Sequence, residues 1–241
     1  MIFSDIDGTL IHRIEEEGTQ PAGSGRYIST RTIDLIQELQ QKDQFILITG
    51  RRKSGYDQIA DVIPHDYAII EHGGVIISEG VDERWFERVG DTIGKPGEYS
   101  GPLWDYAETL RSEGYKIDSE GRIASFRVYN TEPVLTGGEL EKLFEKLDKE
   151  TEGTGMKVII NENMLDVIPR AAGKANAIRF LGSDYLAIGD NLNDIDMLES
   201  SNYALCPGNA LDEIKSLADY VSPYSYHKGT EDVLEHLKNG F

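Results

Sequence analysis

The chain has 241 residues, 43 of them acidic and 24 basic, and its formal net charge is −19 at pH 7. Such a charge repels nucleic acids and anionic membranes, so we expect neither as a partner. Hydrophobic residues make up 39% of the chain, which is enough for a core in one large domain or two modest ones. Any phosphate-binding site would need local cations against this negative background.

Cysteine usage and the lack of targeting segments favour a cytoplasmic location. Cys206 is the only cysteine, so no internal disulfide can form, as is usual in a reducing compartment. The first residues lack the basic flank and long apolar run of a signal peptide. No apolar stretch approaches the ~20 residues of a membrane span. The sequence also shows no feature that indicates an obligate protein partner.

From residue 1 to about 78, short apolar runs alternate with segments of helical periodicity, a pattern typical of α/β domains. The elements that we expect there are a strand ending at Asp5, a polar loop over 15–25, a helix capped by Ser29 or Thr30, a strand over 45–49, a short helix to about 63, and a strand over 67–70. The run over 45–49 is almost wholly apolar, so we expect it to be buried on both faces of a parallel sheet.

Between residues 79 and 169 the sequence is more charged, and its strands alternate between apolar and polar residues. We expect a half-exposed strand over 122–129, a helix over 139–149, and a hairpin of 156–160 and 165–168 around residues 161–163. Trp85 and Trp104 are expected in the core of this segment. The pattern predicts a separate α+β module.

From residue 170 onward the buried α/β pattern resumes. The expected elements are helices over 175–181, 195–198 and 211–217, strands over 185–188 and 203–205, and a final helix capped by Thr230 that runs to 237. We therefore expect an α/β core of residues 1–78 and 170–241 built on a parallel sheet, and an inserted module of residues 79–169.

The most informative motif is Asp5-Ile6-Asp7-Gly8-Thr9, after the first strand. Alternate strand residues point to the same face, so Asp5 and Asp7 project together at the carboxyl edge of the sheet, where open α/β sheets place their sites. Two adjacent carboxylates favour a divalent cation between them, with one carboxylate free to act as a nucleophile. The alternative is a turn in which both aspartates only bond their own backbone.

Two further positions lie at a strand end or a helix start. Thr49 and Gly50 follow the second apolar run, where a hydroxyl and exposed backbone N–H groups can hold phosphate oxygens. Thr49 has the alternative role of a helix cap. Lys174 opens a helix and can supply a positive charge to a phosphate, although most lysines are simply surface residues.

The second strong motif is the run Gly189-Asp190-Asn191-Leu192-Asn193-Asp194. Asp190 ends a buried strand as Asp5 does, and adjacent parallel strands would bring the two carboxylates together. Oxygen ligands of this kind suit Mg²⁺. Asn193 and Asp194 have the alternative role of capping the next helix.

Taken in this order, the four motifs resemble those of the haloacid dehalogenase superfamily of aspartate-nucleophile phosphatases. Residues 5–9 resemble its first motif, Thr49 the second, Lys174 the third and residues 189–194 the fourth. The insert resembles a type C2B cap, as in the Cof-like branch, which includes sucrose-phosphate and mannosyl-3-phosphoglycerate phosphatases. The resemblance extends over nearly the whole chain, and it implies a Rossmann-like core with an inserted C2B cap.

The resemblance implies a Mg²⁺-dependent phosphatase of a small phosphorylated metabolite, such as a sugar phosphate. Asp5 would attack phosphorus and form an aspartyl-phosphate, and Asp7, with a raised pKa, would protonate the leaving group. The phosphoryl oxygens would be held by Thr49, Gly50, Lys174 and Asn193. The metal site would comprise Asp5, the backbone carbonyl of Asp7, Asp190 and Asp194, the last of which would orient Lys174 or a metal-bound water.

Two other functions use similar residues. A phosphomutase on the same scaffold would pass the phosphoryl group to a second hydroxyl rather than to water. A non-enzymatic phospho-acceptor switch would also pair a strand-end aspartate with a lysine and Mg²⁺. The long insert and the second acid, Asp7, argue against the switch, and we favour hydrolysis.

Two features depart from the usual pattern of the family, and both are expected near the mouth of the site. They are His72-Gly73, where Asn-Gly is common, and a long acidic loop from Ile11 to Arg26. The candidates for binding the rest of the substrate are Arg51, foremost, and Arg122, Arg127, Lys157 and Asn161. Residues 73–74 and 171–173 are candidate hinges that would let the insert close over the site.

Overall fold

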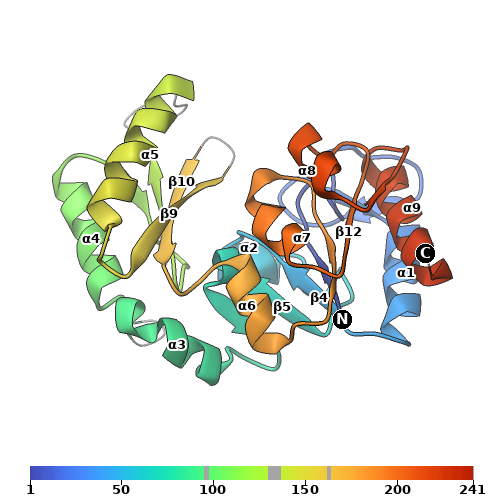
Figure 1. Ribbon diagram of the computed structural model, residues 1–241, viewed down its shortest axis with the longest axis horizontal. Coiled ribbons are helices and arrows are strands. Elements are labelled where there is room, and N and C mark those ends of the chain that lie inside the picture. The colour runs from blue at the N-terminus through green and yellow to red at the C-terminus, as the bar shows by residue number, and fades with distance from the viewer. Residues whose placement is uncertain (95–97, 130–136, 162–163, 241) are drawn as a thin grey trace.

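The computed structural model describes residues 1–94, 98–129, 137–161 and 164–240, which form two main sheets with helices around them (Figure 1). The expected α/β class is confirmed. Within these ranges, no helix is long and apolar enough to cross a membrane.

The larger sheet carries most of the expected core strands. Its order is β13 (Tyr220–Val221), β12 (Tyr203–Cys206), β11 (Leu186–Ile188), β1 (Ile2–Ser4), β4 (Phe45–Ile48), β5 (Tyr67–Ile70) and β6 (Val75–Ile77). All neighbours are parallel except β5 and β6. The central strands β1 and β4 are buried throughout, as their apolar sequences predict for a sheet covered on both faces.

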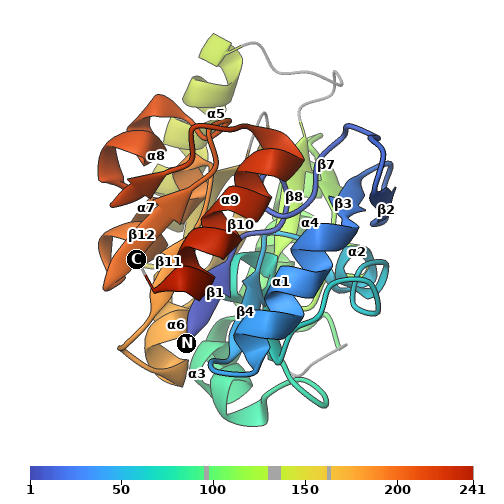
Figure 2. The same cartoon turned by 90° about the vertical axis from the view of Figure 1, so that its right-hand side faces the viewer.

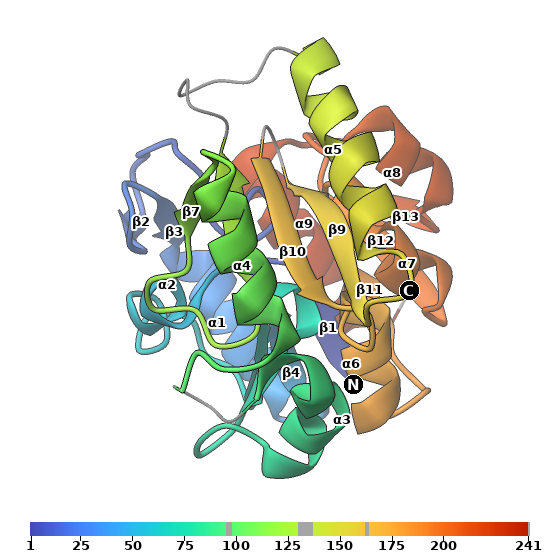
Figure 3. The same ribbon diagram turned by 90° about the vertical axis from the view of Figure 1, so that its left-hand side faces the viewer.

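Helices cover both faces of the larger sheet. On one face α1 (Thr30–Gln40) and α9 (Tyr226–Asn239) pack together (Figure 2), and on the other lies α6 (Lys174–Leu181), beside α7 (Ile195–Glu199) (Figure 3). The short helices are α2 (Lys53–Asp57), α8 (Asp212–Leu217) and two single 3₁₀ turns, η1 (Glu71–Gly73) and η2 (Leu192–Asp194). The predicted cap of α1 is confirmed, because the Ser29 side chain accepts hydrogen bonds from the backbone N–H groups of Arg31 and Thr32.

The smaller sheet is antiparallel, with the order β7 (Lys116–Asp118), β8 (Phe126–Tyr129), β10 (Met164–Pro169) and β9 (Met156–Asn161). Two helices, α4 (Pro102–Ser112) and α5 (Gly137–Thr151), cover its face away from the larger sheet (Figures 1 and 3), and α3 (Glu83–Ile93) leads into it from β6. All four strands fall within the expected insert. The turn of the predicted hairpin at 162–163 lies outside the described residues.

Two glycines near the connections between the sheets lie against each other: Gly73 is in η1, between β5 and β6, and Gly173 is where the chain returns from β10 to α6. A Cβ added to Gly73 would lie 2.8 Å from the backbone nitrogen of Gly173, and both glycines have positive φ angles, +91° and +134°. A larger residue therefore fits at neither position. Trp85 packs beside them: its Nε1 donates a hydrogen bond to the Gly73 carbonyl, and its ring lies against Phe180.

The start of the last helix differs from the prediction. Helix α9 begins at Tyr226, so Thr230 lies one turn inside it and is not its cap. The Thr230 hydroxyl donates instead to the carbonyl of Thr9, 2.5 Å away, and thereby joins the helix to the loop after β1. A threonine inside a helix and one at its start look alike in sequence, since both hydroxyls bond the backbone.

Two loop regions also differ from the prediction. The polar loop over 15–25 contains a short strand, β2 (Thr19–Pro21), which pairs with β3 (Tyr27–Ser29). Residues 122–125 do not extend β8, because the buried carboxylate of Glu71 accepts the backbone N–H groups of Ile123 and Ala124, each at 2.9 Å.

Candidate functional site

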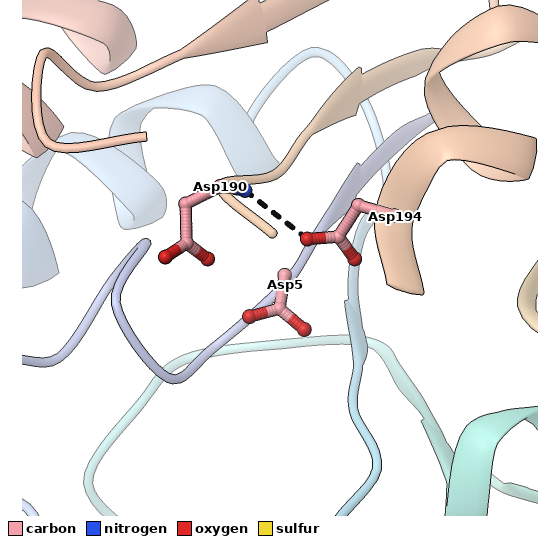
Figure 4. Close-up of side chains that lie close together, drawn as sticks. All are labelled: Asp5, Asp190 and Asp194. Atoms are coloured by element: carbon pink, nitrogen blue, oxygen red, sulfur yellow. Dashed lines mark hydrogen bonds between the residues drawn. The ribbon is translucent and has the colours of Figure 1, made fainter. Parts of the chain in front are cut away.

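Three carboxylates meet at the carboxyl edge of the larger sheet. Asp5 follows β1 and Asp190 follows the adjacent parallel strand β11, while Asp194 ends η2. Each offers an oxygen atom, and these three oxygens lie within 4.8 Å of one another (Figure 4). The strand register, which aligns Ser4 with Ile188, brings the two strand ends level.

Lys174 lies between two of these carboxylates. Its Nζ is 2.5 Å from Asp5 Oδ1 and 2.5 Å from Asp194 Oδ1, and the lysine is 5% exposed. Burial alone would lower the pKa of Lys174, but the two carboxylates outweigh burial and raise it. Asp194 Oδ2 accepts the backbone N–H groups of Asp190 and Asn191. Both oxygens of Asp194 are thus engaged, and this residue positions Lys174 and the loop after β11.

Burial also shifts the other two carboxylates. It is the largest cause of the raised pKa of Asp5, which Lys174 partly offsets, and Asp194 and Asp190 raise it further. The pKa of Asp190 is raised to about 7 by burial and by the nearby charge of Asp194, against the hydrogen bond from Thr9. Carboxylates this close are unfavourable as anions unless a cation joins them.

The residues fit the divalent cation that the sequence predicts. Every donor is an oxygen, as Mg²⁺ requires. Gly8, with φ +93°, leaves the space in front of Asp190 open, because a Cβ there would lie 2.9 Å from Asp190 Cγ and closer still to Oδ2. Asp5 and Asp190 are therefore the side chains best placed to hold the ion.

Asp7 does not join this acidic cluster through its carboxylate. Arg51 donates to both of its oxygens at 2.7 Å, and Arg26 Nε lies 2.5 Å from Oδ1. Burial raises the pKa of Asp7, but the hydrogen bonds and charges of Arg51 and Arg26 outweigh burial and leave it below the ordinary value. The predicted raised pKa of Asp7 is therefore wrong for this arrangement. No local pattern around Asp7 indicates that two arginines converge on it.

Thr49, Gly50 and Asn193 line the same cavity as Asp5 and Asp7, and its volume is about 430 Å³. The Thr49 hydroxyl accepts the backbone N–H of Arg51 at 3.1 Å, which leaves its own hydrogen for another acceptor. Asn193 Oδ1 is buried and has no hydrogen-bond partner among the described residues. Gly50 is packed so closely against the His72 ring that a Cβ would lie less than 3.0 Å from it.

The opposite wall of the cavity comes from the smaller sheet. Of the candidates there, Arg122, Arg127 and Asn161 line the cavity, whereas Lys157 is not among its lining residues and instead approaches Gly173. Lining residues that the sequence did not single out are Arg13, Ser24, Arg52, Gly55, Asp118, Tyr129, Met164 and Asn191. The long loop that was expected near the mouth contributes Arg13, Ser24 and Arg26. Its expected position was the only sign in the sequence that these residues line the cavity.

A buried polar network joins the two sheets behind this wall. Asp166 on β10 is 0% exposed and accepts two hydrogen bonds from Arg127 at 2.7 Å, one from His72 Nε2 at 2.9 Å and one from Asn161 at 3.1 Å. Burial raises the pKa of Asp166, but Arg127 and His72 outweigh burial and hold it well below its usual range. His72, unusual at this position in the sequence, thus connects the larger sheet to the smaller one.

Comparisons with known proteins agree with this geometry. A family model described as haloacid dehalogenase-like hydrolase matches residues 2–89 and 85–234. The phosphoglycolate phosphatase of Sulfurisphaera tokodaii is 24% identical over 250 residues, covering 99% of this chain and 94% of that protein. The crystal structure of Thermoplasma acidophilum 0175 has a TM-score of 0.71 at 21% identity and covers 99% of this chain and 98% of its own. The Synechocystis sucrose-phosphatase, solved with sucrose and phosphate, has a TM-score of 0.65 at 21% identity, with 99% and 96% covered.

Proposed function

We propose that this chain, which belongs to the haloacid dehalogenase-like hydrolase family, is a Mg²⁺-dependent phosphatase that hydrolyses a small phosphorylated metabolite through an aspartyl-phosphate. The observation that carries the proposal is the position of Asp5. Its carboxylate lines the cavity, accepts a hydrogen bond from Lys174 and is grouped with Asp190. Relatives named phosphoglycolate phosphatase and a structural neighbour named sucrose-phosphatase support the reaction class.

Asp5 is the nucleophile in this proposal. An oxygen of its carboxylate attacks phosphorus, and the bond between phosphorus and the leaving oxygen breaks. Lys174 holds Asp5 in place and partly offsets the rise in the pKa of Asp5 that burial causes. Mg²⁺ bound by Asp5 and Asp190 would offset the repulsion between an anionic nucleophile and an anionic phosphoryl group.

Asp7 supplies the proton for the leaving oxygen and later accepts one from the attacking water. In the arrangement described here Arg51 and Arg26 favour its ionised form, which suits the second step, the activation of water. The first step needs Asp7 in its protonated form, so these arginines must shift part of their hydrogen bonding from Asp7 to the substrate. A phosphoryl group entering beside Arg51 provides that alternative acceptor.

The two parts of the chain have separate tasks in this proposal. Residues 1–78 and 170–241 hold the phosphoryl group, through Thr49, Gly50, Lys174 and Asn193. Residues 79–169 form a cap whose wall of the cavity contacts the rest of the substrate. It stays a prediction that the substrate is a sugar phosphate and that the protein is cytoplasmic.

The test is release of inorganic phosphate from a panel of phosphorylated metabolites, with Mg²⁺ and with EDTA. We expect turnover with Mg²⁺ and its loss in EDTA, with recovery when Mg²⁺ is restored. Asp5→Asn should abolish turnover while keeping the wild-type thermal unfolding profile. An Asp57→Asn variant on exposed α2 is the matched control. Full activity of Asp5→Asn would refute the assignment of the nucleophile, and isomer formation without phosphate release would indicate a mutase.

A further inference from the structure

The charge of the cavity is opposite to that of the chain as a whole. Its lining contains six arginines and three carboxylates, in a protein with 24 basic and 43 acidic residues. The six arginines are Arg13, Arg26, Arg51, Arg52, Arg122 and Arg127. A single phosphoryl group beside Asp5 does not require arginines on the opposite wall, where the leaving group would lie.

Two arginines of the cavity, Arg127 on the smaller sheet and Arg52 at the start of α2, have close carboxylate partners. Arg127 forms a two-bond pair with Asp166, and Arg52 donates to both oxygens of Asp118 at 3.1 and 3.3 Å. These pairs are electrically balanced, and they leave little acceptor capacity for another cation.

Arg122 has carboxylates nearby but makes no hydrogen bond to them. It is 4% exposed, and the hydrogen bond that it makes is from Nη1 to the Ser125 hydroxyl at 3.1 Å. The nearest carboxylate oxygens, on Asp118 and Asp166, lie 3.8 and 3.9 Å from Nη2, beyond hydrogen-bond distance. Its Nε has no partner among the described residues.

The carboxylates around Arg122 are committed to other donors. Asp118 and Asp166 bind Arg52 and Arg127, and the buried oxygens of Glu71 accept from Ile123, Ala124 and Ser125. A guanidinium has five N–H donors, and a buried one with so few bonds is costly until acceptors reach it. Since Arg122 lines the cavity, a ligand there can supply them.

We propose that the leaving group of the substrate carries a second anionic group, a carboxylate or a second phosphate, and that Arg122 binds it. This inference rests on the proposed phosphatase function and narrows its substrate class. Both anions match the planar fork of a guanidinium, which binds two oxygens side by side. A neutral sugar would present only hydroxyl groups to Arg122, and a guanidinium binds these less strongly than it binds an anion.

The experiment compares substrates that differ in the second charge alone. Phosphoglycolate carries a carboxylate where 2-hydroxyethyl phosphate carries a hydroxymethyl group, and ethylene glycol bisphosphate supplies the phosphate arm. We expect the wild type to favour one of the two doubly anionic esters by at least about tenfold in kcat/KM. Which of them is preferred identifies the second anion.

Arg122→Gln should lower kcat/KM for that ester by about 10–100-fold, mainly through KM, because the lost contact is made equally in the ground and transition states. The neutral ester should change by less than about threefold. Arg111→Gln, at an exposed cap arginine outside this cavity, should change neither. Arg122→Lys, which keeps the charge and loses the fork, should give an intermediate loss and replaces Arg122→Gln if that variant does not fold.

The inference is overturned if the wild type hydrolyses the neutral ester as well as the anionic ones, or if Arg122→Gln slows all esters equally. Failure of the proposed function has a different signature, which is no phosphate release from any ester. In that case calorimetric titration of the Asp5→Asn protein with the same esters still decides whether the cavity has a second anion site. Tighter binding of a doubly anionic ester, lost on replacing Arg122, supports a second anion site, and equal binding of both kinds excludes it.

Discussion

Gly50→Ala is expected to lower the free energy of unfolding by about 2.5–6 kcal/mol and to reduce turnover. A Cβ at this position would meet the His72 ring at less than 3.0 Å, whereas ordinary contacts begin at 3.4 Å. The ring is 1% exposed and is held by a 2.9 Å hydrogen bond to Asp166, so it has no free direction of movement. Overpacking costs about 1–3 kcal/mol, and loosening a hydrogen bond to a charged group costs about 1.5–3 kcal/mol more.

The assay is urea unfolding followed by circular dichroism, together with phosphate release. Gly55→Ala is the matched control, because Gly55 lines the same cavity but lies inside α2, where the nearest atom to an added Cβ is 3.7 Å away. That variant should be more stable than the wild type by about 0.5–1 kcal/mol, the usual gain for alanine over glycine in a helix. A Gly50→Ala protein as stable as the wild type would show that His72 is not fixed by Asp166.

Three further predictions concern buried ionisable groups. Asp166→Asn should cost about 3–5 kcal/mol of stability in urea unfolding, because it leaves Arg127 without its charged partner. The pKa of Asp166 is lowered in the folded protein, so its contribution to stability is present above the ordinary pKa of an aspartate and is lost as the pH falls. The variant should lack this loss of stability in acid. Lys174→Met should abolish phosphate release, because Asp5 and Asp194 lose the cation between them. The control Lys53→Met, on exposed α2, should keep the wild-type rate. A Lys174→Met protein that retains turnover would contradict the role of Lys174 in positioning Asp5. Burial, with the charges of His227 and Arg26, lowers the pKa of His12 to about 3, so the unfolded chain binds the proton more readily and stability should fall by about 2 kcal/mol between pH 6.5 and 5. His12→Gln should remove this part of the pH dependence of urea unfolding, and an unchanged slope would assign it to another group.

The strand ends were the most predictable part of the molecule. Apolar runs ending in Asp5, Thr49 and Asp190 identified three strands of one parallel sheet, and parallel strands end at the same edge. The structure brings Asp5, Asp190 and Asp194 together for that reason. Lys174 joined them because the helix that it opens starts at the same edge.

Contacts between distant segments were not predictable in the same way. Arg26 reaches Asp7 from an acidic loop, and Asp166 reaches His72 from the other sheet, so neither pair has a characteristic spacing. The wrong pKa for Asp7 follows from this, because the charge of a carboxylate depends on neighbours that the local sequence does not contain. The misplaced start of α9 has a local cause: the same hydroxyl chemistry serves a helix cap and a helix interior.

The contact between Gly73 and Gly173 has an evolutionary consequence. The inserted residues follow β6 and end before α6, and η1, which directly precedes β6, lies against the start of α6. The threading of the larger sheet therefore does not depend on what is inserted there. A module of different size or topology, with termini equally close, can be exchanged there without disturbing the residues that handle phosphorus. Descendants of this chain can therefore acquire new selectivity by recombination at one junction, while the reaction itself is inherited intact.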